Sequence, residues 1–252
     1  MEGAFQFADL DTARLLLACA VAFVASVMSG VAGYGAGLVL PAFLAPLVGV
    51  TNVIPMMAMV ILLNNFSRVI AFWRHIEWHH ARTILLLGIP GCLLGGWGFT
   101  LLSSRWVSLL LGLFLLVSVP LRRYLHKTRF RITPTMQCLA GGMFGFINGG
   151  MAGTGVILIS IMMAAGLQGM ALIATDGVIG VAMAITKIVL FGGLSRLTLE
   201  LALVGLLVGL CTSPGAFIAK RLLAHIPMKI HIWVMEAVVV IGAVPLIWAG
   251  IQ

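Results

Sequence analysis

Long hydrophobic runs follow one another along the chain, with few charged positions between them. The first is free of charged residues from Leu15 to Ser67, and further charge-free runs cover Thr83–Ser104, Trp106–Leu121 and Leu201–Ala219. A helix of about 20 apolar residues spans a bilayer. The runs do not alternate between apolar and polar residues, as the strands of an outer-membrane barrel would. The pattern therefore predicts an all-α polytopic membrane protein.

Composition agrees with this setting. The 252 residues are 62% hydrophobic and 9% charged, whereas a soluble domain has about 25% charged residues. Too few polar residues remain to cover a water-exposed surface. The expected partners are the lipid bilayer and a small anionic substrate. The net charge of +8 is attributed to basic cytoplasmic loops, and no binding of nucleic acid is expected. A homodimer is left open.

Basic residues gather in three segments, at 68–82, 122–131 and 220–229. Cytoplasmic loops of membrane proteins carry an excess of Lys and Arg, so the three segments are expected in the cytoplasm. Counting crossings from there places both termini on the periplasmic side of a bacterial inner membrane. The single spans predicted in this way are Thr51–Phe72, Thr83–Ser103, Trp106–Tyr124, Met170–Phe191, Leu197–Ala219 and Ile230–Ala249.

Each half of the chain also holds a glycine cluster inside an apolar run, "SGVAGYGAG" at 29–37 and "GGMAGTG" at 149–155. In both halves the crossing count is satisfied by a hairpin folded back at the glycines. The expected fold is two inverted repeats, 1–130 and 131–252, which together form one transport domain. Each repeat is a glycine-broken hairpin plus three transmembrane helices.

The two glycine clusters match each other position by position. At a constant offset, Gly30, Ala32, Gly33, Gly35 and Leu38 meet Gly150, Ala152, Gly153, Gly155 and Leu158. Inverted repeats are typical of secondary transporters, whose site lies near the bilayer midplane where broken helices meet. Glycine permits the positive φ that a break requires.

The half-helices after the breaks, at about 35–48 and 155–167, are expected to direct free N–H groups toward a cavity, where they favour an anion. Close helix packing is the alternative role for these glycines. The packing role is left open for Gly30 and Gly150. A helix break is favoured for the two G-x-G pairs, Gly33/Gly35 and Gly153/Gly155.

With "G-x-x-G-x-G" leading an apolar hairpin in each half, the chain resembles the sulfite exporter TauE/SafE family of membrane transporters over roughly 14–250. The resemblance implies transport of small anions, typically sulfite or organosulfonates such as sulfoacetate. Export is the expected direction.

Polar residues inside the predicted spans are the remaining site candidates, because ionisable groups at membrane depth are costly and usually functional. Lys187 lies in "AMAITKIVLF", and Asn64, Asn65 and Arg68 lie in "ILLNNFSRVI". Snorkelling of Lys187 to the outer interface, a topological charge at Arg68 and interhelical hydrogen bonding by the asparagines are the alternatives. The predicted substrate-binding set is Gly33, Tyr34, Gly35, Asn64, Asn65, Arg68, Gly153, Thr154, Gly155 and Lys187.

Asp176 is a candidate for ion coupling, with a structural hydrogen-bonding role as the alternative. It lies eleven residues before Lys187, which is about 16 Å along a helix, so no direct pair between them is expected. No cofactor or metal is expected either. The closely spaced histidines His75, His79 and His80 lie in a basic loop that would repel a cation.

Two other functions share some of these features. An intramembrane serine protease needs a serine and a histidine base within the bilayer, but every histidine lies in or beside a basic segment. The chain is therefore not expected to be an enzyme. An anion channel would have the same composition and polar residues, and it remains the alternative to a carrier.

Overall fold

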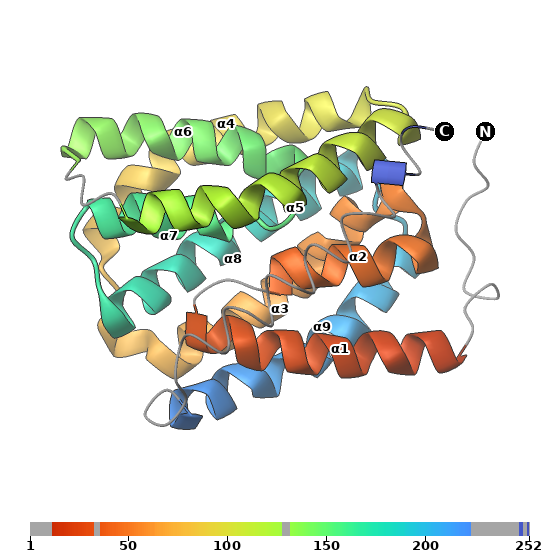
Figure 1. Cartoon of the computed structure of the whole chain (residues 1–252), viewed down its shortest axis with the longest axis horizontal. Helices are drawn as coiled ribbons and strands as arrows, with labels where there is room; N and C mark the ends of the chain where they lie inside the picture. Colours follow the sequence, from red (N-terminus) through yellow and green to blue (C-terminus); the bar gives the residue numbers. More distant parts are fainter. Residues whose placement is uncertain (1–11, 33–35, 128–131, 223–246, 249–250, 252) are drawn as a thin grey trace.

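The computed structural model describes residues 12–32, 36–127, 132–222, 247–248 and 251, and within them it contains helices and no strand (Figure 1). The elements are α1 (Thr12–Ala32), α2 (Ala36–Val48), α3 (Val50–Phe72), the short 3-10 helix η2 (Trp73–His75), α4 (Trp78–Thr100), α5 (Ser104–Lys127), α6 (Pro134–Gly150), α7 (Gly155–Ala164), α8 (Gly169–Gly193) and α9 (Leu199–Leu222).

Four helical segments of the described chain are long and apolar enough to cross a bilayer. They are Val50–His75, Trp78–Thr100, Gly169–Gly193 and Leu199–Ala219. These segments confirm four of the predicted spans as long apolar helices, and the chain is a multi-pass membrane protein. The predicted span Trp106–Tyr124 lies within α5, and most of Ile230–Ala249 lies outside the described residues.

The second predicted hairpin is broken where its glycines are. Helix α6 ends at Gly150 and α7 begins at Gly155, and Gly153 between them has a φ of 83°. Helix α2 begins at Ala36, close to the predicted start of the first half-helix, but Gly33, Tyr34 and Gly35 lie outside the described residues.

Helices α3 and α8 pack against each other in opposite directions. Along α3, Asn65 lies against Gly180 of α8, and further on Arg68 reaches back to Ile173. In contrast, α4 and α6 run in parallel, because Ile84 faces Gly141 at one end of the interface and Gly96 faces Gly149 at the other. These directions are visible along the horizontal axis of Figure 1.

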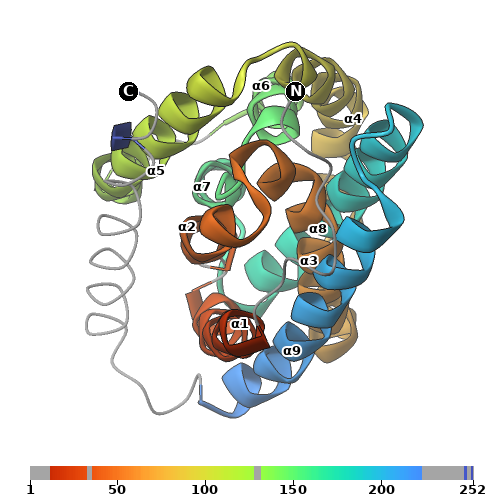
Figure 2. The same cartoon turned by 90° about the vertical axis from the view of Figure 1, so that its right-hand side faces the viewer.

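The packing between the two halves is reciprocal. Helix α1 packs on α9 as α6 packs on α4, and α3 packs on α9 as α8 packs on α4. Seen end-on in Figure 2, the short helices α2 and α7 lie between α1 and α6, with α3 and α8 beside them. The two short helices therefore lie inside the bundle.

Glycines allow α4 and α6 to touch along their backbones. A Cβ on Gly95 would overlap the carbonyl oxygen of Phe146, and one on Gly145 would overlap that of Gly88. Small residues have this role in membrane helix pairs. Gly150 belongs to the same interface, since an added Cβ would lie 3.2 Å from the carbonyl oxygen of Gly95. For Gly150 the packing alternative is thus correct.

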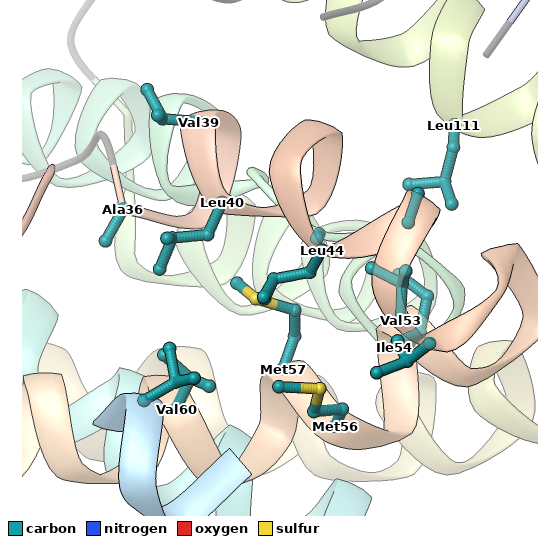
Figure 3. Packing of buried hydrophobic residues seen from close by; sticks show 14 of the residues in the cluster. Ala36, Val39, Leu40, Leu44, Val53, Ile54, Met56, Met57, Val60 and Leu111 are labelled. Carbon is teal, nitrogen blue, oxygen red and sulfur yellow. The ribbon is translucent and has the colours of Figure 1, made fainter. Parts of the chain in front are cut away.

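Apolar side chains fix the first short helix against its neighbours. Leu40 and Leu44 of α2 are fully buried and point toward Met57 of α3 (Figure 3). Helix α2 is entirely apolar in sequence, which allows it to bury side chains against its neighbours on several sides.

Segments that carry the three predicted basic clusters approach the same end of the molecule. The α3–α4 junction, the end of α5 and the end of α9 lie at the left of Figure 1, while the α4–α5 and α8–α9 connections lie at the right. The described parts of the three basic segments therefore lie at one end of the molecule, which is called the basic end below.

Candidate functional site

A cavity of about 70 Å³ lies among α3, α6, α7 and α8. In this measure a water molecule needs roughly 10–15 Å³, so the cavity has room for about five waters or one small oxyanion. Every described residue of the predicted site contributes to its wall, together with Asp176. These wall residues are Asn64, Asn65, Arg68, Gly153, Thr154, Gly155, Asp176 and Lys187.

Lys187 lies deep in the protein. It is 3% exposed, and its Nζ donates a hydrogen bond to the carbonyl oxygen of Met151, 3.4 Å away. The alternative that this side chain snorkels to the interface is therefore wrong. Among the described residues Lys187 has no carboxylate partner, so none of their side chains compensates its ammonium charge.

Arg68 is also buried, at 2% exposure, which rules out a charge at the cytoplasmic surface. Its Nη1 lies 2.7 Å from Asp176 Oδ2 and donates to Asn65 Oδ1 at 3.0 Å. Its Nη2 donates to the carbonyl oxygen of Ile173 at 3.4 Å. The guanidinium thus ties α3 to α8 on one side of the cavity.

The Arg68–Asp176 pair was not predicted. The sequence does offer a signal for it, because both residues lie near the cytoplasmic ends of their predicted spans, Thr51–Phe72 and Met170–Phe191, and so at a similar depth. A buried charge requires a partner, and an opposite charge at equal depth on a neighbouring span is the natural one.

Among the described residues, two cations and one carboxylate line the cavity, which leaves one positive charge without a counter-charge. Lys187 and Arg68 supply the cations and Asp176 the carboxylate. The opening of α7 adds to the same potential. Thr154 does not cap this helix with its side chain, and the N–H groups of Gly155 and Val156 precede Ile157, whose N–H donates to the carbonyl oxygen of Thr154 at 2.9 Å. The cavity is therefore electropositive.

Several polar atoms in the wall have no hydrogen-bond partner in the described structure. They are Asn64 Oδ1, Asn148 Oδ1 and Arg68 Nε. Buried polar atoms are normally bonded to protein or water, so Arg68 Nε is available as a donor to a ligand and the two amide oxygens as acceptors. No hydrogen bond from the side chains of Asn64 or Asn65 to another helix is found among the described residues. The structure therefore gives no support to interhelical bonding by these asparagines.

The wall residues that are absent from the predicted set are Gly37, Ala58, Ile61, Phe144, Asn148, Leu158, Gly180, Met183 and Ala184. Asn148 donates from Nδ2 to Thr154 Oγ1 at 2.5 Å and so holds the residue after the break. Gly37 lies in the first turn of α2, and a Cβ there would lie 3.2 Å from the nitrogen of Gly153. The first turn of α2 thus meets the break of the second hairpin.

The closely spaced histidines His75, His79 and His80 do not line the cavity. His80 Nδ1 lies 3.1 Å from Gln137 Oε1, between α4 and α6, and neither residue lines the cavity. Within the described part of the chain, no group of three or more His, Cys, Asp or Glu side chains could hold a metal ion.

The model of the family "Sulfite exporter TauE/SafE" matches residues 18–246, which is most of the chain. The chain belongs to this family. As a TauE/SafE member it is a sulfite exporter-type membrane transporter, in agreement with the expectation that it is not an enzyme. A search of the curated proteins found no match, and neither did a search of the solved structures.

Replacement of Gly153 tests whether the break shapes the cavity of this TauE/SafE member. Gly153→Ala places a Cβ at φ 83°, where it would overlap the side chain of Leu38. A left-handed conformation costs a non-glycine residue roughly 1–2 kcal/mol. We expect a lower melting temperature and at least tenfold weaker sulfite binding per folded molecule, measured by calorimetry on purified protein.

Gly166→Ala is the matched control. Gly166 has a φ of 98° with open space around an added Cβ, and it does not line the cavity. We expect similar backbone strain but unchanged affinity. Parental affinity in Gly153→Ala would show that this glycine does not shape the site.

Proposed function

We propose that the protein is a secondary transporter that exports sulfite or an organosulfonate such as sulfoacetate across the bacterial inner membrane. The anion binds in the cavity near the midplane, between the two broken hairpins. The observation that carries this proposal is the buried ammonium of Lys187, which has no carboxylate partner among the described residues.

Electrostatics favours an anion as the occupant. A lone charge at membrane depth costs several kcal/mol, and the protein offers Lys187 only a carbonyl oxygen. An anion about 4 Å from the ammonium gains about 4 kcal/mol at an effective dielectric constant of 20. The start of α7 adds about half a positive charge. Together these contributions offset the dehydration of a small oxyanion.

The two sides of the cavity suit a sulfonate. Polar groups from Asn64, Arg68 and Lys187 offer hydrogen-bond donors to an oxyanion, whereas Phe144 and Leu158 present apolar surface. An oxyanion head with a short aliphatic part would satisfy both. The small volume favours such compact anions over larger organic acids.

Two inverted repeats, 1–130 and 131–252, are part of the same proposal. The reciprocal packing of the two halves and the antiparallel contact of α3 with α8 support it. Transporters built in this way alternate access by moving one repeat against the other around a central site. Here Asn64 and Arg68 come from the first repeat and Lys187 from the second.

The basic end of the molecule is proposed to face the cytoplasm, which leaves both termini in the periplasm. Cysteine labelling tests this orientation. In a variant whose four native cysteines are replaced by alanine, Leu194→Cys should react with an impermeant maleimide in intact cells, and Trp78→Cys only after permeabilisation. Both positions are exposed. The opposite result would invert the proposed topology.

The Lys187→Gln variant tests the site directly. It keeps a long polar side chain but removes the charge, so we expect binding of sulfite and sulfoacetate to weaken at least tenfold, or by about 1.4 kcal/mol. Lys187→Arg should keep part of the affinity, because it retains the charge with altered geometry. Affinity is measured by calorimetry on monodisperse protein.

Arg74→Gln serves as the control, since it removes one positive charge from an exposed position in η2. It should bind as the parent does. Parental affinity in Lys187→Gln would exclude this lysine from the anion site and remove the main support for the proposal.

A further inference from the structure

The cavity contains a carboxylate, which is unexpected in an anion site. Asp176 lines the same wall as Lys187 and is paired with Arg68. We infer that Asp176 binds a proton, and that Arg68 alternates between this carboxylate and the transported anion. A proton and an anion are thus carried together. This inference rests on the proposed function of the cavity.

Arg68 is placed to have two partners. Its Nη1 faces Asp176, while its Nε lacks a hydrogen-bond partner in the described structure and Arg68 itself lines the cavity. While Asp176 is ionised, it compensates the guanidinium and weakens the attraction of Arg68 for a second anion. A proton on the carboxylate removes that compensation, and the guanidinium becomes available to the substrate.

The two binding events must then favour each other. With Asp176 ionised the three cavity charges leave one positive charge, and with Asp176 protonated they leave two. An anion is held more tightly by the second state. By thermodynamic linkage, a bound anion must strengthen proton binding by the same factor. The cavity therefore couples the two ligands without any further residue.

For a monoanion the coupled step is electrically neutral. A proton on Asp176 and one anion beside Arg68 and Lys187 restore the net charge of the empty cavity. The empty and loaded proteins then reorient in the membrane with the same charge. Neither ligand bound alone has this property, because each would leave a different net charge at membrane depth, where charge is costly.

Of the other titratable or charged groups on the elements around Asp176, Arg68 and Lys187 line the same cavity and the rest do not. Helix α7 has no titratable or charged residue. The described groups on α3, η2, α4, α6 and α8 are Arg68, Arg74, His75, His79, His80, Arg82, Cys92, Cys138 and Lys187, and Glu77 directly precedes α4. Of these, only Arg68 makes an ion pair with Asp176 in the described structure. Glu77 is exposed, although its backbone N–H donates to Thr175 Oγ1 at 3.0 Å.

Coupling of this kind makes the direction of transport depend on both gradients. Proton and anion leave the cell together while the anion is in sufficient excess inside. A large inward proton gradient reverses the flow. Export in this account therefore continues only at high internal anion concentration.

Calorimetry with methanesulfonate tests the inference, because the charge of this ligand is constant between about pH 6 and pH 8. In the parent protein the affinity should fall up to tenfold for each pH unit over which Asp176 is ionised in the empty cavity. Titrations in two buffers of different ionisation enthalpy should show close to one proton taken up per anion bound. This measurement requires no variant to fold.

Asp176→Asn mimics the protonated carboxylate. It should bind methanesulfonate at pH 8 at least tenfold more tightly than the parent, with an affinity that no longer depends on pH. Glu77→Gln removes a nearby exposed carboxylate and should retain the parental pH dependence. In proteoliposomes an inward proton gradient should drive accumulation by the parent and by Glu77→Gln, but not by Asp176→Asn.

The outcomes separate the two proposals. Binding by the parent with no proton uptake and no pH dependence would overturn the inference and leave the anion site intact. Retention of the parental pH dependence by Asp176→Asn would assign the proton to another group and also overturn it. Absence of methanesulfonate, sulfite and sulfoacetate binding at every pH would overturn the proposed function, and with it the inference.

Discussion

Burial of charge at membrane depth is the constraint on which the remaining structure depends. Arg68 and Lys187 are almost fully buried in a protein with very few charged residues, and Asp176 compensates only one of them. Two buried cations with one carboxylate are stable only if the protein and a ligand supply further negative charge or oriented dipoles. The architecture can be understood as the means of placing these groups around one cavity.

The helix arrangement follows from that requirement. Helices α3 and α8 are long and antiparallel, and together they carry all three charges. The glycine contact between α4 and α6 brings α6 close to the bundle, so that its end and the start of α7 reach Lys187. The positive φ of Gly153 then turns the chain beside the cavity that this residue lines, where irregular backbone is tolerated at membrane depth.

Much of this could be predicted from local sequence. Four long apolar helices and the second glycine break coincide with predicted elements, because hydrophobic run length and glycine placement act over short distances. The described residues of the predicted site also share one cavity, since polar groups in otherwise apolar spans have few stable positions other than a common interior.

Contacts between distant segments could not be predicted in the same way. The pair Arg68–Asp176 joins two helices far apart in sequence, and its recognition requires their depth and relative direction. Asn148 was not predicted, because it directly precedes the second glycine cluster and that stretch was interpreted from its glycines alone. Whether a glycine packs or breaks a helix also depends on its neighbour in space, as Gly150 and Gly153 illustrate.

The most direct test of the account is to locate a bound anion experimentally. Selenite has the charge and shape of sulfite, and its selenium atom can be identified by anomalous scattering from crystals of the full chain. An anomalous peak is expected inside the cavity, within hydrogen-bonding reach of Lys187 and Arg68. A peak elsewhere, with the cavity empty at saturating selenite, would contradict the claim that this cavity is the transport site.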